Sequence, residues 1–195
     1  GNFGNILAAY YAKNLGVPIA KLICASNDNK VLYDFFQTGT YDKNREFVLT
    51  TSPSMDILIS SNLERLIYLI CGEDSEKTKE LMEELKTTGK YTITLEMKEK
   101  LADFAAGYST EEETAESIHD TYQKTGYVMD THTAVAAHVC GQYRAKSGDQ
   151  TKCVIASTAS PYKFVKSVMS AIDAENANAD EFDLLPKLQE VSGVP

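Results

Sequence analysis

Gly1-Asn2-Phe3-Gly4-Asn5 is the stretch that indicates the fold, because an apolar helical pattern follows it at once: Ile6, Leu7, Ala8, Ala9, Tyr10 and Ala12. Two glycines beside small amide side chains let the backbone approach a ligand closely. The free N–H groups at the start of the helix point back at the loop, and a helix N-terminus carries about half a positive charge. The stretch therefore predicts an anion site or, in the simpler interpretation, a Gly-Asn turn that only leads into a helix.

The residues after this helix alternate between strand and helix patterns. Gly16-Val17-Pro18 breaks the helical pattern, and residues 19–25 predict a short buried strand because their apolar run shows no alternation. The next helix is expected after Asn27-Asp28-Asn29, with Asn27 and Asn29 as capping residues, and it should end at Gly39. This order predicts an α/β fold built on a doubly wound open sheet.

A hydroxyl-rich turn, Thr50-Thr51-Ser52-Pro53-Ser54, is predicted to be a loop, because Pro53 disfavours helical backbone at the residue before it. Ser60-Ser61-Asn62 is interpreted as the cap of a helix whose apolar positions are Leu63, Leu66, Ile67, Leu69 and Ile70. Glu64 and Arg65 fall on its other face, where neighbouring charges are usually solvated. Arg65 is the better anion ligand, because a guanidinium can grip phosphate or carboxylate through two nitrogens.

The amino-acid composition changes between residues 73 and 108, where Lys, Glu and Thr surround a few apolar positions. This change predicts a peripheral helical insertion. Ser109-Thr110-Glu111-Glu112-Glu113 then predicts a helix start, because a hydroxyl cap followed by acids complements the helix dipole. This helix should end near Gly126 and lead into a short strand at 127–129.

Asp130-Thr131-His132-Thr133 is a second polar cap, which opens a helix of small residues. His132 is either a general base or a residue that is hydrogen-bonded locally. Residues 153–156 predict a buried strand that ends in Ser157-Thr158-Ala159-Ser160-Pro161, where another helix begins. Ligands of open α/β folds gather at such carboxyl ends of strands. The polar tail from Asn176 is expected to dock a last turn or two of helix.

Composition limits the classes of partner. The chain has 195 residues, 43% hydrophobic and 24% charged, which is enough for a core, and its length suits one large domain or one and a half. A formal net charge of -9 argues against nucleic acid and against an anionic membrane, since both attract a basic face. No run of about 18 apolar residues predicts a membrane span, and the first residues show no signal-peptide pattern. We therefore expect a cytoplasmic protein.

The cysteines and histidines show no metal-binding spacing. No C-x-x-C pair exists among Cys24, Cys71, Cys140 and Cys153, and His132 and His138 fall on different faces of a helix. No metal and no disulfide framework are expected.

Segments spread over residues 1 to about 172 resemble the threonine synthases, a family of fold type II pyridoxal phosphate enzymes. Gly1 to Asn5 resembles the family's cofactor-phosphate loop. Further similar segments follow in the family's order: Ala25-Ser26-Asn27-Asp28-Asn29, Asp34-Phe35-Phe36-Gln37-Thr38-Gly39, Thr51-Ser52-Pro53-Ser54-Met55-Asp56-Ile57, Ser60-Ser61-Asn62-Leu63-Glu64-Arg65, Asp130-Thr131-His132-Thr133-Ala134 and Ser157-Thr158-Ala159-Ser160-Pro161. The family's Schiff-base lysine lies upstream of the phosphate loop. The chain thus resembles the C-terminal part of a threonine synthase, and an N-terminal part of the same enzyme is its expected partner.

The resemblance implies a role for individual residues. The phosphate of pyridoxal 5'-phosphate would lie at Gly1, Asn2, Phe3, Gly4 and Asn5, and the hydroxyl of Thr158 would face the pyridine nitrogen. If Thr158 has no such role, it caps the helix before Pro161. Substrate contacts are implied at Ser52, Ser54, Asn62, Arg65 and His132. Asn27 and Asn29, if they are not caps, would be rim contacts near the cofactor.

The implied reaction converts O-phospho-L-homoserine and water into L-threonine and phosphate, and the chain alone should be inactive because it lacks the Schiff-base lysine. The resemblance divides the chain into four parts: 1–72 for the cofactor phosphate, 73–108 as the helical insertion, 109–172 as the rest of the α/β domain and 173–195 as a C-terminal tail. The alternatives are another fold type II lyase such as a relative of the tryptophan synthase β chain, a non-catalytic phosphate-binding module, and a nucleotide-binding domain. The last would normally carry G-x-G-x-x-G after a strand, which this sequence lacks.

Overall fold

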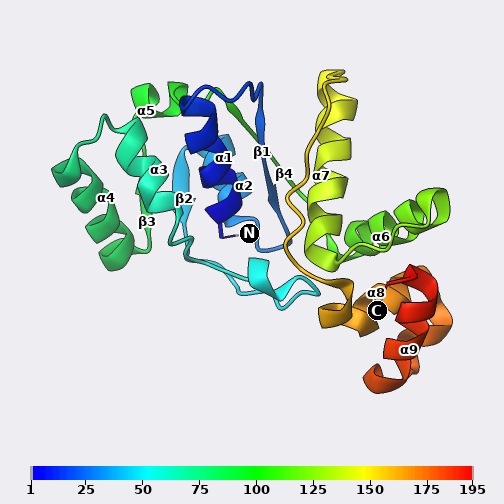
Figure 1. Ribbon diagram of the computed structural model, residues 1–195. Helices are drawn as coiled ribbons and strands as arrows, with labels where there is room; N and C mark the ends of the chain where they lie inside the picture. The colour runs from blue at the N-terminus through cyan, green and yellow to red at the C-terminus, as the bar shows by residue number, and fades with distance from the viewer. Residues whose placement is uncertain (1, 195) are drawn as a thin grey trace. The chain divides into compact units, whose positions relative to one another are not determined.

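The computed structural model describes residues 2–194, which form two compact units (Figure 1). The first unit contains residues 1–49 and 54–108, and the second contains residues 50–53 and 109–195. The helices and strands of the first unit are α1 (Gly4–Asn14), β1 (Leu22–Ser26), α2 (Val31–Thr38), β2 (Thr40–Asp42), α3 (Leu63–Ile70), α4 (Ser75–Thr88), β3 (Lys90–Thr92), α5 (Leu95–Glu99) and β4 (Phe104–Tyr108).

The strands of the first unit form two small sheets. β1 pairs in parallel with β4, so that Leu22 lies opposite Phe104, and β2 pairs antiparallel with β3. Tyr41 of β2 and Tyr91 of β3 stack face to face with ring centroids 5.5 Å apart, and both rings are buried. Burial raises the pKa of Tyr41 to about 12, because a phenolate would lose its hydration there.

Residues 73–108 contain more than the helices predicted from the sequence. The helices α4 and α5 are present, but β3 and β4 accompany them. β4 has the sequence Phe-Ala-Ala-Gly-Tyr, which contains none of the β-branched residues that usually indicate a strand. Its pairing with β1 comes from the fold, because the register joins residues about eighty positions apart.

The second unit is built from helices. They are α6 (Glu111–Thr125), α7 (Thr131–Ser147), α8 (Val165–Ile172) and α9 (Glu181–Ser192), with 3-10 turns at Pro161–Phe164 and Ala174–Asn178. Its core contains Ile118, Ala134, Val165, Val168, Leu184 and Leu188.

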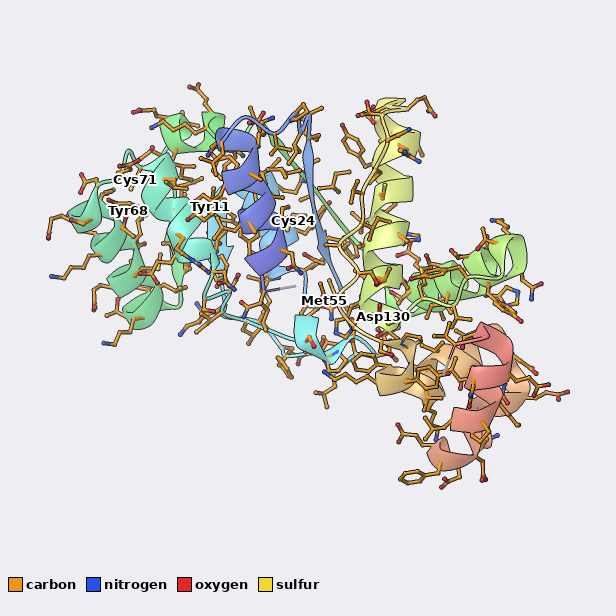
Figure 2. The ribbon with its side chains drawn as sticks, viewed as in Figure 1. Tyr11, Cys24, Met55, Tyr68, Cys71 and Asp130 are labelled. Carbon is orange, nitrogen blue, oxygen red and sulfur yellow. The ribbon has the colours of Figure 1, made fainter. Side chains whose placement is uncertain are left out.

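The predicted starts of α6 and α7 are confirmed. Thr110 and Glu113 form a capping box at α6, in which each side chain accepts a hydrogen bond from the other's backbone N–H, and α6 is closed by Gly126. Asp130 caps α7 by accepting from the N–H groups of His132 and Thr133, and Figure 2 labels Asp130 at that end of the helix.

Two of the strands predicted from the sequence are absent among the residues that the structure describes, so these two predictions are wrong. Residues 127–129 are irregular, and residues 152–158 run back along α7 as an extended segment without strand pairing (Figure 1). Val154 is 93% exposed. The apolar run at 153–156 predicted burial on both faces, but a strand is buried only when neighbouring strands supply the hydrogen bonds and the covering side chains. Within residues 2–194 no strand pairs with this segment.

Between Asn2 and Val194, no helix is long and apolar enough to cross a membrane.

Candidate cofactor and substrate site

The helix that follows the glycine loop has an open N-terminus. Phe3 occupies the capping position of α1 in the left-handed conformation, with φ 64°, and its side chain makes no capping hydrogen bond. The first turn carries no acidic residue. The backbone donors of this turn, which other helices satisfy with Asp, Ser or Thr, are thus left for another acceptor. Gly1, the first residue of the predicted loop, lies outside the described residues.

Phe3 holds the loop in this conformation. A non-glycine residue with φ near +60° costs about 1 kcal/mol or more, and it persists only where the surroundings fix it. The Phe3 ring is 3% exposed and stacks on Phe36 and Phe104 at centroid distances of 6.0 Å. The core of the first unit therefore anchors the loop through a single side chain.

The protein's own packing does not require glycine at position 4. A Cβ placed on Gly4 would meet Asn62 Nδ2 at 3.6 Å, which is an ordinary van der Waals contact, and its φ is not in the left-handed region. Gly4 is exposed. The bare backbone is therefore a surface that a ligand can approach closely, and this fits a phosphate at the N-terminus of α1.

Asn62 does not cap α3, although the sequence predicted that it would. It occupies the capping position, but its side chain makes no capping hydrogen bond. Instead Nδ2 donates to the carbonyl oxygen of Asn2 at 2.7 Å, and Oδ1 accepts from the Arg65 guanidinium. The structure thus brings the loop, Asn62 and Arg65 together, whereas the side chain of Glu64 is exposed.

The segment that leads into Asn62 is fixed by Tyr41, a residue that the sequence analysis did not single out. The Tyr41 hydroxyl donates to the Leu58 carbonyl at 2.9 Å and accepts from the Ser60 N–H at 2.7 Å. Ser60 is 6% exposed, and its own hydroxyl finds no hydrogen-bond partner among the described residues. A buried hydroxyl without a partner is costly, so this atom marks a place where a ligand group would be favourable.

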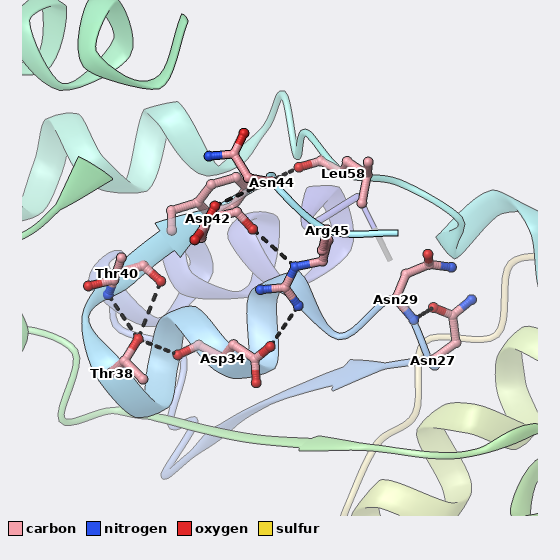
Figure 3. A network of polar contacts seen from close by, with 10 residues as sticks. Asn27, Asn29, Asp34, Thr38, Thr40, Asp42, Asn44, Arg45 and Leu58 are labelled. Carbon is pink, nitrogen blue, oxygen red and sulfur yellow. Dashed lines mark hydrogen bonds and ion pairs between the residues drawn. The ribbon is translucent and has the colours of Figure 1, made fainter. Parts of the chain in front are cut away.

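Asn27 and Asn29 are not caps of α2 either. The capping position belongs to Lys30, and it has no side-chain cap. Asn27 Nδ2 and Asn29 Nδ2 donate to Asp56 Oδ1 at 2.7 and 3.0 Å. Figure 3 shows that Asn27 also accepts from the backbone N–H of Asn29. The amide of Asn29 further bonds both backbone groups of Val48. These buried amides hold the chain around residues 48 and 56 against the start of α2, a long-range role that local capping statistics do not reveal.

A second set of predicted residues lies in the second unit. Ser52 is fully buried there; its N–H donates to Thr50 Oγ1, and the two hydroxyls lie 3.2 Å apart. The N–H of Thr51 donates to Glu111 Oε2, which ties this short segment to α6. Ser54 belongs to the first unit and is exposed.

His132 is held by its neighbours at the start of α7. Its Nδ1 lies 3.4 Å from Asp130 Oδ1, and its ring packs on Phe164 at a centroid distance of 4.8 Å. For Asp130, burial raises the pKa, but hydrogen bonds from the side chains and backbone N–H groups of His132 and Thr133 outweigh that effect and leave the pKa below its ordinary value. The Asp130 carboxylate is therefore a fixed negative charge beside the imidazole.

Thr158 follows a residue that is tied to α7. Thr133 Oγ1 and Ser157 Oγ form a hydrogen bond at 2.9 Å, while Thr158 itself is exposed. The alternative role of Thr158 as a helix cap is wrong, because Ser160 caps the turn at Pro161–Phe164 by accepting from the Tyr162 N–H. Over residues 2–194, no group of three or more His, Cys, Asp or Glu side chains has the arrangement of a metal site.

Comparison with known proteins identifies the class. A family profile described as "Threonine synthase, C-terminal" matches residues 133–195. The crystal structure of pyridoxal phosphate-bound threonine synthase from Brucella melitensis superposes with a TM-score of 0.82 at 42% identity, over 88% of this chain and 36% of that chain. Yeast threonine synthase superposes with a TM-score of 0.85 at 36% identity, over 100% of this chain and 42% of that chain. The fold is therefore that of the fold type II pyridoxal phosphate enzymes, as predicted.

Sequence similarity identifies the family within this class of enzymes. The human protein named "Threonine synthase-like 1" is 42% identical over the whole of this chain and 26% of its own length. The chain belongs to the threonine synthase family and matches the C-terminal portion of its members, which confirms the resemblance seen in the sequence. It spans between about a quarter and two fifths of the length of these relatives.

Proposed function

We propose that this chain is the C-terminal portion of a threonine synthase, which converts O-phospho-L-homoserine and water into L-threonine and phosphate. The observation that carries the proposal is the open N-terminus of α1 behind a loop anchored by Phe3. Similarity to a threonine synthase described as bound to pyridoxal phosphate supports the same cofactor here. We also propose the four-part division made from the sequence and a cytoplasmic location.

The residues of the loop fit a phosphate. Asn2, Phe3, Gly4 and Asn5, with Gly1 ahead of them, would present backbone N–H groups and about half a positive charge to the cofactor's phosphate, and the first turn of α1 contains no acidic residue. When bound, the cofactor supplies an electron sink for carbanions, while the protein supplies binding, orientation and electrostatics.

The side chains beside the loop fit the anionic substrate. Arg65 offers a guanidinium that can bind a phosphate or carboxylate through two nitrogens, and Asn62 holds it in place. The buried hydroxyl of Ser60 would gain a partner from a bound anion. We further propose Ser52, Ser54 and His132 as substrate contacts, with the Asp130 carboxylate 3.4 Å from Nδ1 of the His132 imidazole.

Thr158 is the proposed contact of the pyridine nitrogen. The hydrogen bond between Thr133 and Ser157 ties the preceding residue to α7, so the position of Thr158 depends on a helix and not only on a loop. A hydroxyl cannot supply the negative charge that stabilises a protonated ring, so the nitrogen would stay largely neutral and the sink would be mild.

A second candidate is a relative that binds the cofactor without forming threonine. The name "Threonine synthase-like 1", which is carried by relatives that match the whole chain, favours it.

The test compares this chain with the complete protein. Each is mixed with pyridoxal phosphate, reduced with borohydride and mapped for the labelled lysine, and products from O-phospho-L-homoserine are measured. We expect a single labelled lysine outside residues 1–195, and threonine and phosphate from the complete protein only. Stoichiometric labelling of a lysine within this chain, or cofactor binding without threonine formation, contradicts the proposal. In the complete protein, Thr158→Asp should shift products from threonine towards keto acid, whereas the matched Thr158→Ser should change little.

A further inference from the structure

Asn62 occupies a position where its side chain ordinarily stabilises the helix that follows. An asparagine before the first turn usually accepts from a backbone N–H of that turn. In this structure the side chain of Asn62 makes no such bond, and both ends of its amide bond other residues instead. Nδ2 reaches the carbonyl of Asn2, sixty residues away, and Oδ1 accepts from Arg65.

Asn62 holds a backbone carbonyl next to the residue with the unusual conformation. The carbonyl of Asn2 belongs to the peptide unit before Phe3, the residue with φ 64°. A left-handed conformation at a non-glycine residue persists only where contacts on both sides fix it. The Phe3 ring supplies one contact through the core, and the hydrogen bond from Asn62 supplies the other.

Asn62 also lies against the open end of α1. A Cβ on Gly4 would lie 3.6 Å from Asn62 Nδ2, so the amide abuts the first turn whose N–H groups have no cap.

We infer that Asn62 is a positioning residue that couples the two halves of the site: it orients the glycine loop for the cofactor's phosphate and holds Arg65 for the anionic substrate. The inference rests on the proposed function of the loop. The amide is suited to this task because it donates at one end and accepts at the other, so one side chain can fix a carbonyl and a cation at once.

The experiment uses the complete protein and three changes. Asn62→Ala removes both bonds, Asn62→Asp keeps an acceptor for Arg65 but has no donor for Asn2, and Arg65→Ala removes only the cation. The measurements are amide hydrogen exchange of residues 3–7, the Kd for pyridoxal phosphate with the ³¹P shift of its phosphate, and the KM and kcat for O-phospho-L-homoserine.

Faster exchange of residues 3–7 and a Kd for the cofactor raised about three- to tenfold are expected for Asn62→Ala and Asn62→Asp, as for a lost hydrogen bond. Arg65→Ala should leave both unchanged and raise KM. Asn62→Ala should raise KM as well, while Asn62→Asp should raise it less. Asn62→Gln, which keeps both functional ends of the amide, should recover part of the cofactor affinity.

Unchanged exchange in Asn62→Ala overturns the inference. Faster exchange with an unchanged Kd also overturns it, and Gly4→Ala then tests the proposed function separately. If Gly4→Ala still weakens cofactor binding, the loop binds the phosphate and only the role of Asn62 is wrong; if it does not, the proposed function of the loop fails.

Discussion

Gly4→Ala should make the protein more stable and its cofactor binding weaker. Gly4 is the first residue of α1, its φ is not in the left-handed region, and the nearest atom to an added Cβ is Asn62 Nδ2 at 3.6 Å. No packing penalty is therefore expected. Because alanine favours helix over glycine by about 0.5–1 kcal/mol, the free protein should gain up to about that amount.

The substitution should cost more binding free energy for the cofactor phosphate than it adds to the stability of the helix. A methyl group on the first turn blocks the approach of an anion to the backbone N–H groups, and losing one hydrogen bond to a charged group costs about 1–3 kcal/mol. This corresponds to a Kd for pyridoxal phosphate raised by about five- to 150-fold, since about 1.4 kcal/mol is a factor of ten.

The assay is thermal unfolding of the complete protein with and without pyridoxal phosphate, together with direct titration of the cofactor. Gly141→Ala is the matched control, because Gly141 lies inside α7 with nothing within 4 Å of an added Cβ. The control should gain stability with no change in Kd. A lower unfolding temperature for the free Gly4→Ala protein, or a Kd equal to that of the control, would refute the reasoning.

The remaining predictions concern the second unit. Asp130→Asn should lower the free energy of unfolding by about 1–3 kcal/mol near pH 7, because the buried cap of α7 loses a charged acceptor. Since the folded-state pKa of Asp130 lies below its ordinary 3.8, the carboxylate's contribution is complete above about pH 5 and is lost as the pH falls through the folded pKa. Urea unfolding from pH 7 to 3 should show the gap to Asp130→Asn narrowing, and a constant gap would contradict this. Cys140 and Cys153, whose sulfurs lie 2.9 Å apart, should form a disulfide with oxidised glutathione. Exposed Cys153 attacks and releases one glutathione, and Cys140, whose pKa burial raises to about 11, then displaces the second. Mass spectrometry should show a loss of about 2 Da that Cys153→Ser abolishes; persistent free thiols would count against it.

Local chemistry in the sequence was enough for several elements. Thr110 and Glu113 predict the capping box of α6, and Asp130 predicts the cap of α7, because each needs only residues within one turn of the other. The anion site at Gly1 to Asn5 stays a prediction of the same local kind: glycines followed at once by an apolar helix leave backbone donors free.

The roles of Asn27, Asn29 and Asn62 could not be predicted from their sequence neighbours. Each was interpreted as a cap, and each has a side chain that bonds a distant partner: Asp56 for the first two and the Asn2 carbonyl for the third. An amide can serve a helix end or a remote carbonyl equally well, so its choice depends on what the fold places beside it.

The sequence by itself determined the family, the α/β alternation and the loop at the start of α1, because motif order, periodicity and helix starts are written along the chain. Only the tertiary structure decided that Phe3 takes a left-handed conformation fixed by Phe36 and Phe104, and that Asn62 joins the loop to Arg65. It also decided that residues 153–156, apolar enough for a buried strand, lie unpaired here. These features depend on contacts between segments far apart in sequence, and the energy of such contacts is set by packing and pairing partners that no local pattern encodes.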